Sequence, residues 1–347
     1  MKHVGKNAPE AIHPAQFTRS ASHVVHPPSS PTPARSALIL AFAAIYVIWG
    51  STYLGIRVAI ETMPPFLMAG FRFALAGAIL LAFLRWRGLP FPNARQWRAN
   101  AVIGIFLLLG GNGLVVWAEH RIPSGITALL IATEPLWIAV LMPMFKAGKS
   151  PGLRTFAGIA CGLAGVGVLV AGRGLGGGTV DPVGVVAVIA ASGFWAGGSL
   201  YTLRATSPSS PFIASGIQML AGGLLLGVTG LVTGEWQSFD PAQVSARSLA
   251  ALAYLIVFGS IVAFTAYSYL LRNARPTVVS TYAFVNPIVA VLLGWLIAGE
   301  ALSGRVALAG LFILGALWAI LRDEPEVEQL VTDPDPKTGD AARSCAG

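Results

Sequence analysis

The stretch ALILAFAAIYVIWGSTYLGIRVAI, residues 37–60, decides the fold class, because Arg57 is its only charged residue. As a helix rising about 1.5 Å per residue, it is long enough to cross a hydrocarbon core of roughly 30 Å. It exceeds the roughly 7–15 apolar residues of a signal-peptide core and follows a long polar tail. We therefore expect it to be retained as a membrane span.

The composition supports a bilayer as the solvent of the whole chain. The 347 residues are 55% hydrophobic and 11% charged, with a mean hydropathy of +0.70, whereas soluble domains carry roughly 25% charged residues. The net charge of +8 does not predict nucleic-acid binding here, because loop cations set membrane orientation. Cys161 and Cys345 form no CxxC or Cys/His cluster, so neither a disulfide nor a metal site is expected.

Apolar segments separated by short links rich in Pro, Gly and Ser predict ten helical spans. A lipid-facing backbone must satisfy its own hydrogen bonds, and the runs lack the alternation of a membrane barrel. The predicted fold is an all-α integral membrane protein with disordered tails at residues 1–35 and 323–347. The spans are placed at about 37–60, 65–84, 99–118, 124–145, 154–171, 182–203, 211–233, 248–271, 276–298 and 304–321.

Cations in the loops predict the orientation of these spans. With a cytoplasmic N-terminus, the inner loops carry Arg85, Arg87, Arg95, Arg98, Lys146, Lys149, Arg154, Arg204, Arg272 and Arg275. The outer loops then carry only Arg121, Arg173, Arg247 and Arg305. This excess on one side, with an even number of spans, predicts that both termini are cytoplasmic.

The two halves of the chain resemble each other. At an offset of 146 residues the matched pairs are Trp49 and Trp195, Leu54 and Leu200, Pro65 and Pro211, Gly70 and Gly216, and Gly77 and Gly223. At an offset of 152 they are Pro135 and Pro287, Leu141 and Leu293, and Gly158 and Gly310. Each unit, 37–171 and 182–321, has five spans. Because five is odd, the second copy must be inverted, which places a binding site between the copies near mid-bilayer. Duplication for helix packing alone is the alternative.

Several short motifs occur in order through both halves: Ile48-Trp49-Gly50-Ser51-Thr52-Tyr53, Pro64-Pro65-Phe66, Gly70-Phe71-Arg72-Phe73, Gly111-Asn112-Gly113, Ala118-Glu119-His120, Val285-Asn286-Pro287 and Gly299-Glu300. In these residues the chain resembles the EamA family of the drug/metabolite transporter superfamily, over about residues 37–321. The resemblance implies a ten-helix carrier of a bacterial-type inner membrane. Members often export amino acids or other small metabolites through a central cavity.

Glu134 is predicted to lie close to mid-bilayer, where a charge costs from about 2.5 kcal/mol upward. The following Pro135 cannot donate an N–H, so we expect a helix break about one turn earlier, near Ile131. Beside the freed carbonyls, the carboxyl can bind a substrate amine or a proton. A buried packing role is the alternative. Asn286 and Pro287 are the repeat-related partners, and we expect them across the same cavity, with Pro287 as a second helix break.

Three further polar residues are candidates for a gate or an ion pair. Arg72 lies roughly 10 Å below the outer end of its helix, where it can form an ion pair, snorkel to the interface or bind a substrate carboxylate. Glu119 and His120 lie at the outer end of the third span, where they can gate or sense pH. An ordinary interfacial location is the alternative.

Aromatic and amide side chains complete the predicted binding site. Trp49 and Trp195 are repeat-related and lie near mid-helix, away from the interfacial belts where tryptophan concentrates. Tyrosines on the same and neighbouring spans can complete an aromatic cavity for apolar or cationic groups. Core packing is the alternative reading. Asn112 lies between two glycines on a weak helical stretch that can open to this cavity. The predicted substrate-binding set is Trp49, Tyr53, Asn112, Glu134, Trp195, Tyr201, Tyr267, Tyr282 and Asn286.

The sequence therefore predicts a secondary transporter for a small amphipathic solute, with export preferred and possible proton coupling through Glu134. No HExxH, P-loop or nucleophile-elbow motif is present, so no enzyme and no cofactor is expected. A channel or facilitator is the second hypothesis, although the chain has no carbonyl filter motif or ring of like charge. A membrane enzyme is the third.

Overall fold

The computed structural model describes residues 35–145, 153–170, 180–206, 208, 210–273, 279, 282–300 and 302–322. Within these ranges every regular element is a helix and no strand occurs, which confirms the all-helical prediction. The predicted tails, apart from Arg35, and the inner-loop residues Lys146, Lys149 and Arg275 lie outside the described residues.

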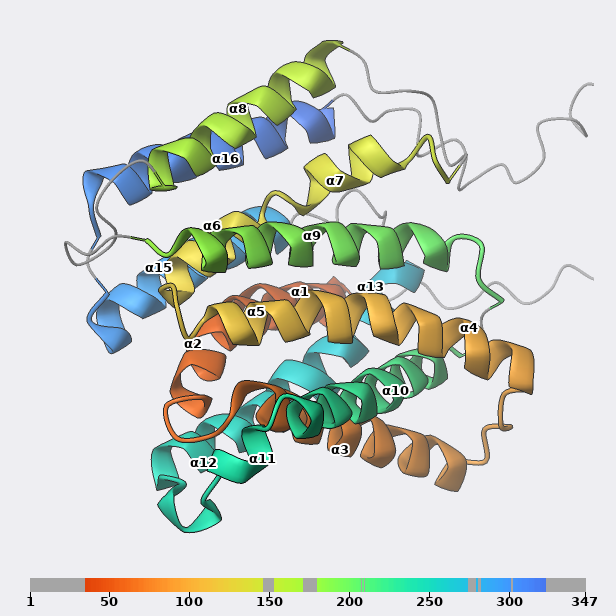
Figure 1. Ribbon diagram of the computed structural model, residues 1–347. Coiled ribbons are helices and arrows are strands. Elements are labelled where there is room, and N and C mark those ends of the chain that lie inside the picture. Colours follow the sequence, from red (N-terminus) through yellow and green to blue (C-terminus); the bar gives the residue numbers. More distant parts are fainter. Residues whose placement is uncertain are drawn as a thin grey trace, which may run out of the picture.

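The helices follow the predicted spans closely, and several are built from consecutive helical pieces (Figure 1). They are α1 (Arg35–Ala44), η1 (Ile45–Trp49), α2 (Gly50–Ala59), α3 (Pro65–Trp86), α4 (Ala94–Gly104), η2 (Ile105–Asn112), α5 (Gly113–Ala118), α6 (Ser124–Ile131), α7 (Glu134–Leu141), α8 (Leu153–Val170), α9 (Pro182–Thr202), α10 (Pro211–Val232), α11 (Glu235–Ser238), α12 (Ala246–Tyr254), η5 (Leu255–Val262), α13 (Ala263–Asn273), α15 (Tyr282–Ala298) and α16 (Gly304–Arg322).

Six helical segments of the described chain are both long and apolar enough to cross a membrane. They are Arg35–Ala59, Pro65–Trp86, Ala94–Ala118, Pro182–Thr202, Pro211–Val232 and Ala246–Tyr267. Shorter apolar helical stretches lie at Ser124–Ile138, which is interrupted after Ile131, at Val285–Ala298 and at Gly304–Ala316. The exposed side chains on these helices include many large apolar ones, such as Leu311 and Val232. That surface is typical of helices solvated by lipid tails rather than water.

Helices α3 and α10 occupy equivalent places in the two sequence repeats, and they pack directly against each other. A methyl group added at Gly70 would lie 3.0 Å from the carbonyl oxygen of Gly223, and one at Gly77 would lie 2.8 Å from that of Gly216. Residue numbers rise along α3 while those of its partners fall along α10, so the helices are antiparallel. If each residue is replaced by its counterpart in the other repeat, the contact of Gly70 with Gly223 becomes the contact of Gly77 with Gly216. Such a pairing is isologous and indicates a two-fold axis perpendicular to both helices.

The remaining contacts between helices show the same symmetry between the two repeats. Helix α8 packs on its counterpart α16, on the opposite side of the bundle from α3 and α10 (Figure 1). Between these pairs, α9 contacts η2, α5 and α7, while the first span contacts α12, α13 and α15. If each helix is replaced by its counterpart in the other repeat, the contacts of α9 become those of the first span. Helix packing therefore has the two-fold pattern that the sequence repeat leads one to expect.

The fourth predicted span is interrupted next to Glu134. Helix α6 ends at Ile131, the N–H of Thr133 donates to the Leu130 carbonyl at 3.0 Å, and α7 begins at Glu134. The hydroxyl of Thr133 also donates to the Leu130 carbonyl, at 2.6 Å. This break lies directly before Pro135, which cannot donate an N–H to continue the ladder. It places a carboxyl at a helix start inside the bundle.

The repeat-related proline behaves differently. Helix α15 continues from Tyr282 to Ala298 through Pro287, so the expected second helix break is absent at this position. Helix α2 packs tightly here, because a methyl group on Gly50 would lie 3.2 Å from the carbonyl oxygen of Asn286. A proline inside a membrane helix is tolerated when neighbouring helices support the backbone.

Candidate functional site

Aromatic rings from three spans meet around Trp49, the last residue of the π-helical segment η1. The centroid of the Trp49 ring lies 5.5 Å from that of Phe264, 5.1 Å from that of Tyr267 and 5.2 Å from that of Tyr282. Tyr267 and Tyr282 also contact each other, at 6.1 Å. These edge-to-face and tilted arrangements are the favoured geometries of aromatic pairs. The structure thus brings three of the predicted aromatic residues together in one cluster.

Phe264 is not in the substrate-binding set predicted from the sequence. It is buried and lies three residues before Tyr267, so both rings are on one face of α13. The i, i+3 spacing of two aromatic residues was the available signal.

Trp195 joins this cluster from the other repeat. It lies on α9 with its indole ring near the Tyr282 hydroxyl. A methyl group on Gly111 would lie 3.0 Å from the Trp195 ring, so the glycine leaves room for it. The two repeat-related tryptophans therefore both contact Tyr282.

Asn112 and Tyr201 have different positions. Asn112 is half-buried at the end of η2 (Ile105–Asn112), a π-helical segment, and such segments occur frequently at functional sites. Tyr201 lies one residue before the end of α9, roughly 9 Å along the helix from Trp195 at 1.5 Å per residue. The structure thus places Tyr201 at the helix end rather than in the Trp49 cluster.

Glu134 lies near the aromatic cluster, at the helix break. Its side chain is 8% exposed, and it lies within electrostatic range of the hydroxyls of Tyr53, Tyr267 and Tyr282. Hydroxyl groups can donate to a carboxylate or accept from a carboxylic acid. We define the central cluster as Trp49, Tyr53, Glu134, Trp195, Phe264, Tyr267 and Tyr282. It combines one carboxyl group with aromatic faces and is built from both repeats.

The side-chain amide of Asn286 hydrogen-bonds to backbone carbonyl groups. Its amide nitrogen, oriented to satisfy its surroundings, donates to the carbonyl oxygens of Tyr46 and Tyr282 at 3.2 and 3.3 Å. Tyr46 lies in η1, where π-helical geometry displaces the normal hydrogen-bond ladder. Asn286 therefore ties α15 to the first span, and in this conformation its amide group serves packing.

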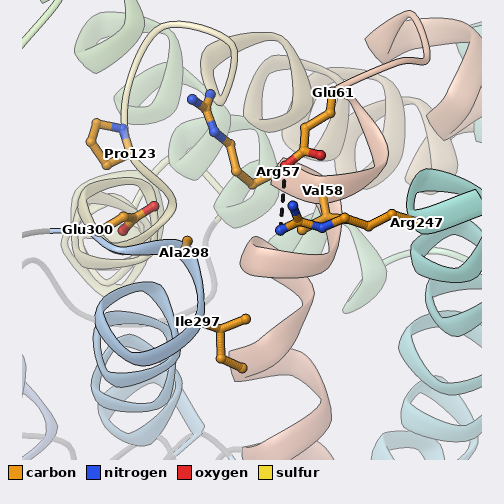
Figure 2. Close-up of a pocket in the computed structure, with 8 residues that line it drawn as sticks. All are labelled: Arg57, Val58, Glu61, Pro123, Arg247, Ile297, Ala298 and Glu300. Atoms are coloured by element: carbon orange, nitrogen blue, oxygen red, sulfur yellow. Dashed lines mark ion pairs between the residues drawn. The ribbon is translucent and has the colours of Figure 1, made fainter. Parts of the chain in front are cut away.

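A second polar region lies at the end of the bundle that carries residues 60–64, 119–123 and 299–300, which we call the outer end after its predicted orientation. A pocket of about 350 Å³ opens there (Figure 2). It is lined by Arg57, Val58, Glu61, Pro123, Arg247, Ile297, Ala298 and Glu300. Its charged residues come from the first, eighth and ninth predicted spans and their loops, so this outer pocket also joins the two repeats.

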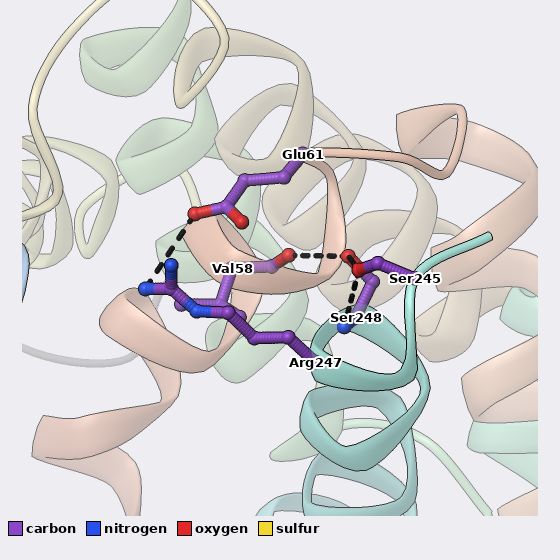
Figure 3. Close-up of polar contacts among 5 residues, drawn as sticks. All are labelled: Val58, Glu61, Ser245, Arg247 and Ser248. Atoms are coloured by element: carbon purple, nitrogen blue, oxygen red, sulfur yellow. Dashed lines mark hydrogen bonds and ion pairs between the residues drawn. The ribbon is translucent and has the colours of Figure 1, made fainter. Parts of the chain in front are cut away.

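One wall of the outer pocket is a polar clasp between α2 and α12 (Figure 3). The Ser248 hydroxyl donates to the Val58 carbonyl at 2.9 Å, and Arg247 lies 3.7 Å from Glu61. The N–H of Ser245 donates to the Thr62 hydroxyl at 3.1 Å. These contacts hold the two repeats together at the outer end.

Glu119 is fully buried beside the outer pocket. It lies directly after α5, and its carbonyl oxygen accepts a hydrogen bond from Arg57. Neither carboxyl oxygen has a hydrogen-bond partner. Burial raises the pKa of Glu119 well above its usual range, and Glu300 adds to this effect, while Arg57 and Arg72 oppose it. Glu119 is 0% exposed, so its side chain points into the bundle and not into solvent.

Arg72 points into the bundle. It is 3% exposed, its Nε donates to the Ser260 hydroxyl at 3.0 Å, and its guanidinium lies 4.5 Å from the Phe73 ring centroid. One guanidinium nitrogen, Nη1, has no hydrogen-bond partner. The expected alternative of snorkelling to the interface is therefore wrong for this conformation, because Ser260 and Phe73 hold the side chain inward.

The neighbours of Glu119 in its own turn face the surface. His120 is exposed, and partial desolvation together with Arg57 and Arg121 lowers its pKa. Arg121 pairs with Asp181 at 3.0 Å and stacks on Trp117 at 4.4 Å. The hydrogen bond from Arg121 lowers the pKa of Asp181. These groups are solvated, and among the described residues no three His, Cys, Asp or Glu side chains form a metal-binding group.

Two glutamates cap helices of the first repeat from loops of the second. Glu300 accepts hydrogen bonds from the N–H and hydroxyl of Ser124, at 3.0 and 2.7 Å, and from the N–H of Gly125 at 3.1 Å. Glu235 accepts from the N–H groups of Phe66 and Leu67, at 3.1 and 2.9 Å. Carboxylates stabilise helix N-termini by filling orphan donors and complementing the helix dipole. The sequence did not reveal these caps, because their partners are over 150 residues away.

Replacing Glu300 with alanine should destabilise the protein measurably. The variant loses three hydrogen bonds at the start of α6, which should cost about 1–2 kcal/mol. Thermal unfolding of purified protein in detergent measures this loss. Glu61→Ala is the matched control, because its exposed pair with Arg247 at 3.7 Å should contribute less than about 1 kcal/mol. Equal stability of the two variants would contradict a capping role for Glu300.

Known proteins are similar to this chain in sequence and in fold. The sequence pattern of the EamA-like transporter family matches the chain twice, at residues 35–171 and 182–322. The inner membrane transporter YedA of Escherichia coli strain K12, which carries the description uncharacterized, is 44% identical over 268 residues, covering 76% of this chain and 83% of YedA. Protein PecM of Dickeya dadantii is 28% identical over 276 residues, covering 78% of this chain and 87% of PecM.

A solved crystal structure resembles this fold with a TM-score of 0.57 at 21% identity, covering 82% of this chain and 97% of that one. At this identity the likeness concerns the fold alone. The sequence matches are more specific, since one spans both repeats and the other exceeds 40% identity over most of both chains. The chain therefore belongs to the EamA-like transporter family.

Proposed function

We propose that this protein is a secondary transporter that moves a small amphipathic solute across a bacterial-type inner membrane by alternating access. The observation that carries the proposal is the central cluster, in which residues of both repeats surround a buried carboxyl at a helix break. A carrier needs its site where two mobile halves meet, so that the site can face either side. Export of a metabolite such as an amino acid is the preferred direction.

The proposed architecture has ten membrane helices in two inverted five-helix repeats, residues 37–171 and 182–321, with both termini cytoplasmic. Its support is the antiparallel, isologous packing of α3 on α10. An axis perpendicular to two membrane-crossing helices lies in the plane of the membrane, which is the relation of inverted repeats. At one end of the bundle, polar contacts are made by residues that follow the first, third, seventh and ninth spans: Glu61, Glu119, Glu235 and Glu300. This agrees with successive spans that alternate in direction.

The central cluster suits a solute with an apolar body and a cationic group. Trp49, Tyr267 and Tyr282 offer aromatic faces, which attract both apolar surface and cations. Glu134 offers one carboxyl that can bind an amine or exchange a proton. The same group can do both in turn if amine binding displaces the proton. Such competition would link solute movement to a proton gradient.

A flux experiment tests carrier function. Protein reconstituted in liposomes loaded with a pH-sensitive dye is exposed to each of the twenty amino acids, and dye fluorescence reports proton movement. Counterflow of the radiolabelled form of an active solute then separates mechanisms, because only a carrier accelerates when unlabelled solute is present on the opposite side. Flux without such acceleration would favour a channel. Chemical conversion of the solute would favour an enzyme.

Topology is tested by labelling single cysteines in a variant without Cys161 and Cys345. Cysteines placed at 88 and 273 should react with a membrane-impermeant reagent from the cytoplasmic side. Cysteines at 62 and 245 should react from the outside. Labelling of positions 88 and 273 on opposite sides would contradict the inverted arrangement.

A further inference from the structure

The buried side chains of Glu119 and Arg72 have unused hydrogen-bonding capacity that the proposed central cluster does not explain. Both carboxyl oxygens of Glu119 and Nη1 of Arg72 lack partners, with the side chains 0% and 3% exposed. An unpaired buried charge is among the most costly features of a folded protein. Something must neutralise Glu119 in this conformation.

Several features of the surroundings disfavour an anionic Glu119. The residue lies at the C-terminal end of a continuous helix of 25 residues, Ala94–Ala118, where the helix dipole repels negative charge. Glu300 acts on it as a like charge. Of the facing cations, Arg57 donates to the Glu119 carbonyl and Arg72 donates to Ser260. The Tyr53 hydroxyl lies within electrostatic range of Glu119 but makes no hydrogen bond to its carboxyl oxygens.

We infer that Glu119 is a proton-binding site near the outer end, and that Arg72 is the positioning residue whose approach releases the proton. A proton is the ligand that needs no cavity, which suits a fully buried side chain. In the present conformation Glu119 holds the proton and Ser260 holds Arg72. When Arg72 leaves Ser260 and pairs with Glu119, the carboxyl O–H bond breaks and the proton passes to water.

The outer pocket supplies the route for that proton. Arg57 and Glu300 line the pocket and also act on Glu119 (Figure 2). Glu119 therefore lies one layer behind a water-accessible surface. Glu134 lies on a different helix, α7, and Tyr53 is within electrostatic range of both carboxyls. The use of the Glu119 proton for transport rests on the proposed function, whereas proton binding itself does not.

Infrared spectroscopy of the purified full-length protein in lipid nanodiscs tests the inference without any substrate. The carbonyl stretch of a protonated carboxyl is measured while the pH is raised. We expect a protonated-carboxyl band at neutral pH that Glu119→Gln removes. Glu134→Gln should leave that component in place. Glu235→Gln is the control and should leave the band unchanged, because the carboxyl oxygens of Glu235 already accept hydrogen bonds from the N–H groups of Phe66 and Leu67.

A second variant tests the role of Arg72. Ser260→Ala removes the partner that holds Arg72 away, so the Glu119 band should disappear at a lower pH than in the wild type. A merely structural role of Ser260 would leave that titration unmoved. An unmoved titration would overturn the positioning role of Arg72.

Thermal unfolding gives an independent readout. Because folding keeps a proton on Glu119 that the unfolded chain releases, stability should fall as pH rises from the ordinary glutamate range through the raised pKa. Glu119→Gln should remove this dependence and keep the neutral-pH melting temperature. A strongly lowered melting temperature would show that an ionised Glu119 pairs with Arg72. That result, or a band unchanged by Glu119→Gln, would overturn the proton site while leaving the flux test of carrier function intact.

Discussion

Gly223→Ala should lower the apparent melting temperature of the purified protein by roughly 5–10 °C, corresponding to about 3 kcal/mol. The added methyl group would overlap the backbone of α3, lying 2.9 Å from the Cα of Ala74 and 2.8 Å from the carbonyl carbon of Phe73. Backbone atoms cannot rotate away as a flexible side chain can. The two helices must therefore separate along the contact that relates the repeats.

Gly227→Ala provides a matched control on the same helix, one turn later. A methyl group there meets nothing within 4 Å, and alanine favours a helix over glycine by up to about 1 kcal/mol. Its melting temperature should be unchanged or slightly higher. Similar destabilisation by both substitutions would mean that glycine flexibility, rather than close α3–α10 packing, matters at these positions.

Glu134→Gln should reduce proton-driven solute accumulation in liposomes at least about tenfold, equivalent to about 1.4 kcal/mol. Glutamine keeps the size and hydrogen-bonding capacity of a protonated glutamate but cannot release a proton. The proposed competition between amine and proton is then lost. Solute counterflow in the absence of a pH gradient, measured with the same vesicles, should persist because the aromatic faces of Trp49, Tyr267 and Tyr282 remain.

Glu61→Gln is the control for this assay, because its carboxylate lies at the outer rim, with a side chain that is 41% exposed. Its accumulation should match the wild type. If Glu134→Gln retained full proton-driven accumulation, Glu134 would have no coupling role, and Glu119 would be the other buried carboxyl of the described residues that could serve in coupling. Loss of all flux, including counterflow, would instead assign Glu134 to solute binding.

Much of the fold could be predicted because long apolar runs in a bilayer have few alternatives to helix. The span predicted over 65–84 corresponds to α3 at Pro65–Trp86, and that over 182–203 to α9 at Pro182–Thr202. Pro135 marked the place where the fourth span is interrupted. Pro287 has the same local chemistry, yet α15 continues through it, since tight packing against Gly50 is a property of the assembled helices.

The central cluster was predicted in part. Trp49 and Trp195 were identified because tryptophan far from the interface is unusual, and the structure brings both to Tyr282. Tyr201 and Asn286 were placed in the same set on sequence position alone. Their surroundings depend on how far each helix extends and which carbonyls are free.

From the sequence alone, this protein is determined to be a duplicated, helical membrane protein of a transporter family, because hydrophobic length and repeated motifs are local properties of the chain. Tertiary structure alone decided that Glu119 and Arg72 are buried without full partners, and that Glu300 caps α6. The physical reason is that burial and hydrogen bonding depend on the distances between helices. Those distances are set at contacts such as that of Gly70 with Gly223, between residues far apart along the chain.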